Sequence, residues 1–284
     1  MRLSVVIPCH NEERLLGGQL TALADQDYRG AWEVVVVDDA STDATRAVAA
    51  SFRSRLPALR IVAAGASGVA HARNAGAAAA SGEALLFLDA DDRAGAGYLQ
   101  AMAAALERSD FVAARLETRT LNTGWVARTR LVEQERDLND VFGFLPWAFG
   151  GTLGVVRSVF DAVGGFPTGR RYGDDVGFCW RVQLAGVPLR FVPDAVVHYR
   201  YRTDLAGIFR QARRYGRSSA AYYRAFRSSG MPRRPLPWVV LKWLSFVVRL
   251  PLVRDRAGWG RWLYDVGIAV GQVQGSIRQR VVYL

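Results

Sequence analysis

Lysine is nearly absent from this chain of 284 residues: Lys242 is the only one, and arginine supplies the other basic side chains apart from three histidines. We attribute this to biased coding composition. Cysteine is scarce too, because Cys9 and Cys179 are too few for a disulfide framework and too far apart for a zinc site. We expect two reduced, buried thiols. The stretch after Met1 lacks the apolar core and cleavage site of a signal peptide, which predicts a main domain in the cytoplasm.

The positive charge is concentrated in the C-terminal part of the chain. Net charge is +11, and from Arg200 onward 17 Arg plus Lys face 3 Asp plus Glu, a net +14. Residues 1–199 contain 20 Arg plus Lys and 23 Asp plus Glu, a net charge of −3. The basic residues lie beside apolar helical stretches and no recognised nucleic-acid module appears, so we expect no nucleic-acid partner. With 50% hydrophobic and 22% charged residues, the chain is globular rather than disordered.

Residues 1–115 alternate strand-like and helix-like segments, which predicts an α/β fold with a parallel, doubly wound sheet. Four runs are nearly continuous in apolar residues, as strands covered on both faces are: 3–7, 33–37, 59–63 and 84–88. Helical spacing is predicted at 15–24, 42–54, 69–81 and 176–185, with further strands at 153–156 and 189–192. Polar residues cluster at 8–12, 38–39 and 89–92, where strands end, so distant acids converge on one ligand-binding edge.

The run Asp89-Ala90-Asp91-Asp92 places several carboxylates directly after a buried strand. Their mutual repulsion is costly unless a cation or hydrogen-bond donors compensate it, and oxygen ligands suit Mg²⁺ or Mn²⁺. Such an ion bridges the two phosphates of a nucleotide diphosphate and neutralises the charge as it leaves. The alternative is an acidic turn in which an aspartate caps a helix.

Three further polar positions share that edge. Asp38 and Asp39 precede Ser41 and Thr42, one of which we expect to cap a helix, leaving an aspartate to bind a nucleobase or a ribose hydroxyl. Arg73 lies early in a helix, where its forked donors suit a diphosphate; an ordinary surface arginine is the alternative.

Asp174 and Asp175 follow Tyr172-Gly173 at a predicted helix N-terminus, where capping explains one carboxylate and leaves the other as a candidate general base. His198 ends a strand-like run. A lone histidine is usually structural, but here it can complete a mixed oxygen and nitrogen metal site, which would favour Mn²⁺ over Mg²⁺.

Over roughly residues 1–200, the chain resembles the family 2 glycosyltransferases of GT-A fold. The resemblance is carried by the order of SVVIPCHNE, VVVVDDASTD, GVAHARNAGAAAASGEALLFLDADD, GTLGVVRSVFDAVGGF, YGDDVGFCWRVQLAG and PDAVVHYR. It implies a Rossmann-like, mostly parallel sheet flanked by helices, with a nucleotide-sugar-binding part at 1–115 and an acceptor side at 116–203. A basic, amphipathic helical tail, 204–284, completes the expected organisation.

The resemblance also implies roles for single residues. Pro8, Glu12 and Asp39 would contact the base and ribose, and Asp89 the ribose. Arg73 would contact the diphosphate. Asp38, next to Asp39, and Ala90, next to Asp89, complete the implied donor site.

On the same resemblance, Asp91 and His198 would bind the divalent metal, Mn²⁺ or Mg²⁺, and Asp175 would be the catalytic base of an inverting transfer. Asp174 stands where the family more often has glutamate, which affects donor positioning. The predicted acceptor side comprises Asp174, Trp147, Gly151, Trp180 and Arg181.

The implied function is therefore sugar transfer from a nucleotide diphosphate donor, such as a UDP-sugar, to a hydroxyl acceptor that is a glycan, lipid-linked or small. One alternative is an inert, membrane-associated scaffold that binds nucleotide sugars. The other is a haloacid-dehalogenase-like phosphohydrolase, which needs a lysine between Asp89 and Asp174; none occurs there.

The tail contains a strongly apolar stretch, 238–250, in which Lys242, Ser245 and Arg249 share one helical face. It is shorter than the about 20 residues that span a bilayer, so we expect an in-plane amphipathic helix or one packed on the main domain. A second stretch, 259–277, spaces Gly267, Gly271 and Gly275 four apart, which predicts a smooth face for close helix contact. With the +14 charge, these helices predict attachment to the inner face of the cell membrane.

Overall fold

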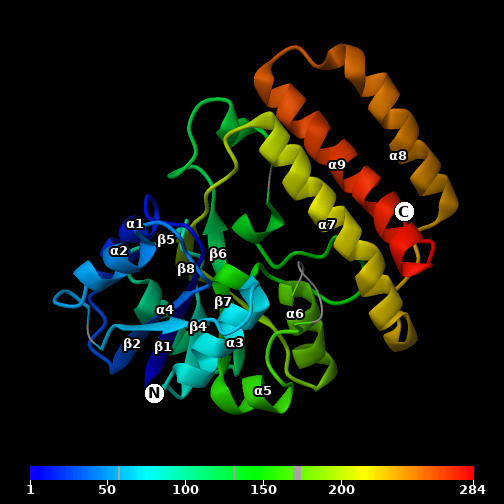
Figure 1. Ribbon diagram of the computed structural model, residues 1–284. Coiled ribbons are helices and arrows are strands. Elements are labelled where there is room, and N and C mark those ends of the chain that lie inside the picture. Colours follow the sequence, from blue (N-terminus) through cyan, green and yellow to red (C-terminus); the bar gives the residue numbers. More distant parts are fainter. Residues whose placement is uncertain (57, 131, 169–173) are drawn as a thin grey trace. The chain divides into compact units, whose positions relative to one another are not determined.

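The structure is a computed structural model that describes residues 1–56, 58–130, 132–168 and 174–284. Its internal contacts divide the chain into two compact units. The first unit comprises Met1–Leu121, Val132–Asn139 and Pro146–Arg200, and the second comprises Asn122–Leu131, Asp140–Leu145 and Tyr201–Leu284 (Figure 1). Two short pieces of the predicted acceptor side therefore belong with the tail.

The first unit is built on a mixed sheet of eight strands in the order β3-β2-β1-β4-β7-β6-β8-β5. One half is parallel, with β1 between β2 and β4, and β3 beside β2. Strand β7 runs antiparallel to β4 and β6, and β8 runs parallel to β6 and antiparallel to β5. The strands are β1 Leu3–Cys9, β2 Trp32–Asp38, β3 Arg60–Ala63, β4 Ala84–Phe87, β5 Arg93–Ala94, β6 Phe111–Glu117, β7 Leu153–Val156 and β8 Arg190–His198.

Helices cover both faces of this sheet, which is why its central strands are continuous in apolar residues. On one face, a core cluster joins α1 and α4 to alternate residues of β1, β2 and β4. On the other face, α3 packs so closely that a Cβ on Gly76 would lie 2.3 Å from Val6 Cγ1. The helices of this unit are α1 Leu16–Ala24, α2 Thr45–Ser51, α3 Val69–Ala79, α4 Tyr98–Leu106, α5 Arg157–Ala162 and α6 Asp174–Leu184, with short 3-10 turns η2 Glu133–Glu135 and η3 Gly150–Thr152.

The second unit is helical. A 22-residue helix, α7 Leu205–Phe226, packs along the 24-residue helix α9 Arg256–Gln279, and α8 Leu236–Arg249 lies beside α9 (Figure 1). Short 3-10 turns complete it: η1 Val126–Arg128, η4 Arg227–Ser229 and η5 Leu250–Leu252. Within the described part of the chain, no helix combines the length and the apolar character needed to cross a membrane.

The glycine face of α9 meets α7, as the four-residue spacing predicts. A Cβ on Gly271 would lie 2.2 Å from the carbonyl oxygen of Arg213, and one on Gly275 would lie 2.6 Å from that of Arg217. The approach is mutual, because a Cβ on Gly216 of α7 would lie 2.1 Å from the carbonyl oxygen of Ile268. The two backbones are therefore in contact, and any side chain at these positions would separate them.

Candidate active site

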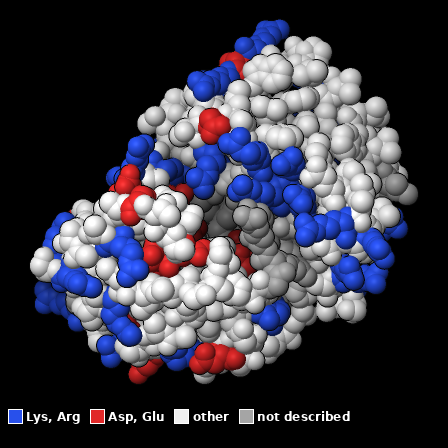
Figure 2. All heavy atoms as spheres, viewed as in Figure 1, with Lys and Arg blue, Asp and Glu red and all other residues white. Residues whose placement is uncertain are grey.

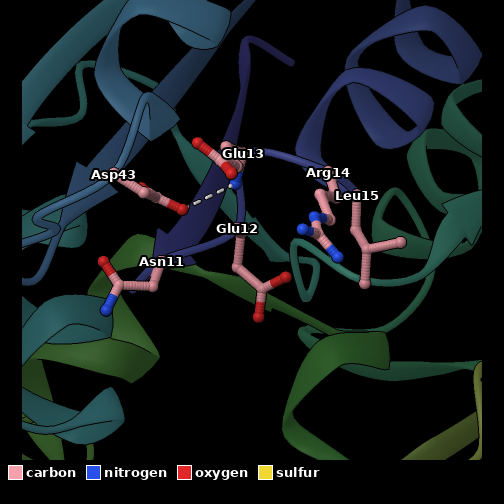
Figure 3. Close-up of a pocket in the computed structure, with 6 residues that line it drawn as sticks. All are labelled: Asn11, Glu12, Glu13, Arg14, Leu15 and Asp43. Carbon is pink, nitrogen blue, oxygen red and sulfur yellow. Dashed lines mark hydrogen bonds between the residues drawn. The ribbon is translucent and has the colours of Figure 1, made fainter.

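The loop after β1 is tied to the loop after β2 by a set of hydrogen bonds. Asn11 has a left-handed backbone, with φ 56°. Its backbone N–H donates to Ser41 Oγ at 3.0 Å, and its side-chain Oδ1 accepts from the backbone N–H of Thr42 at 2.8 Å. The Glu12 amide donates to Thr45 Oγ1 at 2.7 Å. These bonds line up two strand ends beside a pocket of about 410 Å³ (Figure 3). It is lined by Asn11, Glu12, Glu13, Arg14, Leu15 and Asp43.

The two aspartates after β2 have different partners. Asp39 accepts from the Gly68 amide at 2.8 Å, which ties this loop to the start of α3. Asp38 is buried and accepts from the Ser41 amide at 3.3 Å, with the exposed Arg46 at 3.7 Å. The predicted cap at Ser41 or Thr42 is wrong: α2 begins at Thr45, three residues later, because Ser41 and Thr42 are engaged with Asn11 instead.

Arg73 connects two acidic segments that lie far apart in the sequence. Its guanidinium is buried and donates through Nη2 to Asp89 at 2.7 Å and through Nη1 to Asp174 at 2.8 Å. Burial alone lowers the pKa of Arg73, but the carboxylates of Asp89, Asp174 and Asp175 outweigh it and raise that pKa above its ordinary value. Arg73 is thus a fixed positive charge inside the acidic cluster, not a surface arginine.

Two glycines of the turn η3 make room for this pair. A Cβ on Gly150 would lie 2.3 Å from Arg73 Nη1, and one on Gly151 would lie 2.7 Å from Asp89 Cγ. Any larger residue at either position would displace the guanidinium or the carboxylate. Gly151, predicted on the acceptor side, therefore borders the predicted donor site through Asp89.

Asp174 and Asp175 form the first turn of α6, as predicted. Asp174 is buried against Arg73, whereas Asp175 is partly exposed and accepts from the Val176 amide at 2.8 Å. Burial and the neighbouring Asp174 raise the pKa of Asp175 to about 6, with Arg73 acting in the opposite direction. Such a pKa suits a general base near neutral pH. Tyr172 and Gly173, which precede the pair in the sequence, lie outside the described residues.

The acidic run after β4 is held from both sides. Gln19 Nε2 donates to the Asp89 carbonyl at 3.0 Å, and Arg200 Nε donates to the Asp91 carbonyl at 3.0 Å. Asp92 is buried and accepts from the Arg200 amide at 2.8 Å; burial, Asp91 and Asp89 raise its pKa well above the ordinary range. The side chain of Ala90 is buried. Figure 2 shows Asp and Glu side chains gathered together on the face in view.

His198 lies at the end of β8, in register with Glu117 at the end of β6. Its Nδ1 is 2.7 Å from Glu117 Oε2, which leaves Nε2 for another partner. A Cβ on Gly95 would lie 3.5 Å from Nε2, so the glycine keeps that side of the ring open. Arg93 of β5 pairs with His198, which brings the acidic run close to the imidazole. Among the residues that the structure describes, no three His, Cys, Asp or Glu side chains are grouped to hold a metal ion by themselves.

The other residues predicted on the acceptor side are placed differently from one another. Trp147 is partly exposed, and its ring lies 5.1 Å from that of Phe149. Trp180 is fully buried, so it packs inside the unit and has no surface for an acceptor to contact. Arg181 donates to the Gly165 carbonyl, so its guanidinium is engaged within the first unit.

Three amide side chains, of which Gln19 and Gln134 are buried and Asn74 is partly buried, position the site and were not predicted. Gln19 also accepts from the Ala94 amide, at 2.8 Å, and so spans the acidic run. Asn74 makes paired hydrogen bonds of 2.9 and 2.8 Å with the backbone of Phe166. Gln134 donates to Thr152 Oγ1 at 2.7 Å and accepts from the Phe149 amide at 3.0 Å, beside the turn η3. A polar residue within an apolar helical stripe, as at Gln19, is the available sequence signal.

Comparison with known proteins agrees with this arrangement. The profile described as Glycosyl transferase family 2 matches residues 4–176, more than half of the chain. The chain belongs to this family. The strand order also places Asp89 after β4 in the middle of the sheet, and the phosphohydrolase alternative has no support from the match.

Several curated proteins resemble parts of the chain. Validoxylamine A glucosyltransferase of Streptomyces hygroscopicus subsp. limoneus is 46% identical over 106 residues, which are 36% of this chain and 23% of that protein. Poly(ribitol-phosphate) beta-N-acetylglucosaminyltransferase TarS of Staphylococcus aureus (strain Mu50) is 38% identical over 95 residues, 32% of this chain and 16% of its own. Glycosyltransferase AglE of Haloferax volcanii is 29% identical over 198 residues, 68% and 65% of the two chains. The chain thus spans only a minor part of the first two.

Solved structures show the same fold. Mannosyltransferase PcManGT from Pyrobaculum calidifontis, in complex with GDP-Man and Mn²⁺, has a TM-score of 0.65 at 24% identity, over 96% of this chain and 87% of that one. S. aureus TarS 1-349 in complex with UDP has a TM-score of 0.60 at 21% identity, over 99% and 92%. The expected GT-A architecture is confirmed.

Proposed function

We propose that this protein is an inverting glycosyltransferase that moves a sugar from a nucleotide diphosphate donor to a hydroxyl acceptor with the help of a divalent metal. The observation that carries the proposal is the bridge made by Arg73 between Asp89 and Asp174, at 2.7 and 2.8 Å. It joins the loop proposed to bind the donor to α6, whose first turn contains the candidate base, Asp175. Family membership supports the class of reaction.

The donor would lie along the edge formed by the ends of β1, β2 and β4. Pro8, Glu12, Asp38 and Asp39 are assigned to the base and ribose, and Asp89 and the backbone of Ala90 to the ribose and sugar. UDP, UDP-GlcNAc and GDP-Man occupy structural relatives with this fold, which supports a nucleotide-sugar ligand. Arg73 is already engaged with two carboxylates, so its proposed action on the diphosphate combines a long-range positive charge with fixing Asp89.

Asp91 and His198 would hold the divalent ion, and water and the donor's phosphate oxygens would supply its other ligands, as is common for Mg²⁺ and Mn²⁺ with nucleotides. The hydrogen bond from His198 Nδ1 to Glu117 leaves Nε2 for the ion, and mixed nitrogen and oxygen ligands favour Mn²⁺, the ion in the PcManGT complex. Once bound, the ion would offset the negative charge that develops on the departing diphosphate.

Asp175 would supply the base. Its carboxylate takes the proton of the acceptor hydroxyl while that oxygen bonds to the anomeric carbon, and the bond from that carbon to the diphosphate oxygen breaks on the opposite side. Asp174 and Arg73 hold the start of α6, so that the carboxylate stays at a fixed distance from the donor loop. Of the acceptor-side residues, Trp147 is the partly exposed aromatic side chain on which a sugar ring would stack.

The test is hydrolysis of a panel of nucleotide sugars by the purified protein with Mn²⁺, with Mg²⁺ and with chelator. We expect metal-dependent release of nucleotide diphosphate from one donor, and we expect Asp175→Asn to abolish transfer while calorimetry still shows donor binding. Asp161→Asn, on the exposed surface of α5, is the matched control. An active Asp175→Asn enzyme would exclude Asp175 as the base; no release and no donor binding would favour an inert scaffold.

We also propose that the protein works in the cytoplasm, peripherally attached to the inner face of the cell membrane, on a cell-envelope glycan or a lipid-linked acceptor. The support is the net charge of +14 from Arg200 onward, which favours a surface of anionic lipid.

A further inference from the structure

Helix α8 has its polar side turned toward α9. Lys242 Nζ donates to Gln272 Oε1 at 2.8 Å, and Arg249 Nη1 donates to Asp265 Oδ2 at 2.9 Å. Ser245 Oγ caps back onto the Lys242 carbonyl at 2.7 Å. The three polar residues that share one helical face therefore have hydrogen-bond partners within the second unit, and two of them, Lys242 and Arg249, anchor α8 to α9.

Large apolar side chains are exposed around the rest of α8 and on the short turn after it, and Trp238, one turn before Lys242, is exposed at the start of the helix. The exposed fraction of these side chains runs from 39% at Trp243 to 71% at Trp238 and Val247. The nine large side chains concerned are Trp238, Val240, Leu241, Trp243, Leu244, Val247, Val248, Leu250 and Leu252; together they are the outward face of α8.

This orientation is the reverse of that of a helix on a water-facing surface, where the apolar stripe lies inward. A contiguous exposed apolar face of this kind marks a site that another apolar phase covers. The polar side of α8 needs no further partner, since α9 supplies one. What is left to cover is a continuous strip of hydrocarbon.

The surrounding charge indicates which kind of partner covers the outward face of α8. Exposed arginines stand at both ends of it, Arg233 before α8 and Arg254 and Arg256 after it, within a segment of net charge +14. A second copy of the chain would bring two such segments together, which like-charge repulsion opposes. Anionic lipid offers both a hydrocarbon layer and negative headgroups at the helix ends.

The length of α8 sets how it meets the bilayer. Its 14 residues are about 21 Å long at 1.5 Å per residue, shorter than the about 30 Å hydrocarbon layer. We propose that the outward face of α8 is a docking surface that lies in the plane of an anionic membrane, with its apolar side chains below the headgroups and the flanking arginines among them. This rests on the membrane location proposed above and is independent of the transfer chemistry.

The test is flotation of the full chain with vesicles of phosphatidylcholine mixed with phosphatidylglycerol, compared with pure phosphatidylcholine. The triple variant L241Q/L244Q/V248Q should bind the anionic vesicles roughly tenfold more weakly or worse, because it removes apolar area that the bilayer buries. The matched control is I277Q/V282Q, which changes two exposed apolar side chains elsewhere in the second unit, 74% and 52% exposed. R233Q/R254Q should weaken binding to anionic vesicles several-fold and leave weak binding to neutral ones unchanged.

The altered side chains are already exposed, so the thermal midpoint of the triple variant should equal that of the wild type. Binding by the triple variant equal to wild type overturns the proposal. So does a wild-type dimer in sedimentation that the triple variant converts to monomer while neither protein floats, which would make the face a contact between copies. Nucleotide release from the donor panel is measured on the same samples, so loss of vesicle binding with unchanged release tests this surface apart from the enzyme chemistry.

Discussion

Glu117 and His198 form a hydrogen-bonded pair across the ends of β6 and β8, with 2.7 Å between Oε2 and Nδ1. Burial raises the pKa of Glu117, but hydrogen bonds from His198, Thr120 and the Arg119 amide outweigh it and lower that pKa to about 2. An ionised carboxylate only accepts, so Nδ1 donates to Glu117, and Nε2 is the ring nitrogen that this bond leaves for another partner. Carboxylates in this position commonly orient a metal-binding histidine.

Glu117→Gln should therefore weaken Mn²⁺ binding in the presence of a nucleotide diphosphate by about tenfold to a hundredfold. Calorimetry or the Mn²⁺ paramagnetic resonance signal measures this without turnover. Glu107→Gln, at the exposed end of α4, should leave the affinity unchanged. Equal Mn²⁺ affinities in the Glu117 variant and the wild type would show that the Glu117–His198 pair does not support metal binding.

The raised pKa of Asp175 predicts a pH dependence of transfer. An acid whose pKa is raised to about 6 is protonated below that pH and then accepts no proton, so kcat/KM should rise with pH through about 6 and level off above it. A raised pKa also means that the folded state disfavours the ionised form of Asp175, so this carboxylate destabilises the fold above pH 6. Asp175→Asn should therefore raise the free energy of unfolding at neutral pH by about 1 kcal/mol. A pH profile flat between 5 and 7 would contradict the assignment.

Arg73→Gln should destabilise the first unit by about 3 kcal/mol, because it leaves the buried Asp174 and the partly buried Asp89 without their positive partner. Urea unfolding measures the change. The matched control is Arg46→Gln: Arg46 is 64% exposed and lies 3.7 Å from Asp38, so its loss should cost less than about 1 kcal/mol. Equal costs would show that the Arg73 bridge contributes no more than a surface pair.

Gly151→Ala should lower donor affinity, since its Cβ would lie 2.7 Å from Asp89 Cγ and push that carboxylate away. We expect a rise in the donor dissociation constant of about tenfold or more, the cost of roughly 1.4 kcal/mol of misplaced contacts. Gly17→Ala is the control, because the nearest atom to its Cβ would be Val48 Cγ1 at an ordinary 3.7 Å. Unchanged affinity in the Gly151 variant would place the donor away from Asp89.

The strands of the parallel half were predictable because burial on both faces makes them continuous in apolar residues. The strand predicted at 3–7 is β1, Leu3–Cys9, and the strand predicted at 33–37 is β2, Trp32–Asp38. The two-residue strand β5 was missed, because it is too short for periodicity to show. Helix α7 lies within the predicted helical tail, 204–284, but its own bounds were not predicted.

Sequence reasoning can point to a candidate position where an unusual residue type stands at the end of an element, as Asp89 does after β4 and Asp175 does in the first turn of α6. It cannot do so where the chemistry depends on contacts between distant segments. The pairing of Arg73 with Asp174 spans 101 residues, and the His198–Glu117 pair spans 81. Trp180 misled for another reason: an aromatic residue on an amphipathic helix more often fills a core than faces a ligand, and this one is fully buried.

The contact between Lys242 and Gln272 makes the chain unusual toward amine-reactive reagents. Apart from Met1, Lys242 carries the only primary amine, and burial lowers its pKa to about 8. Lys242 is partly exposed, and its Nζ donates to Gln272 of α9, so acylation of this amine breaks the hydrogen bond between the two helices. The extent of acylation, measured by mass spectrometry, therefore reports on this one contact between α8 and α9.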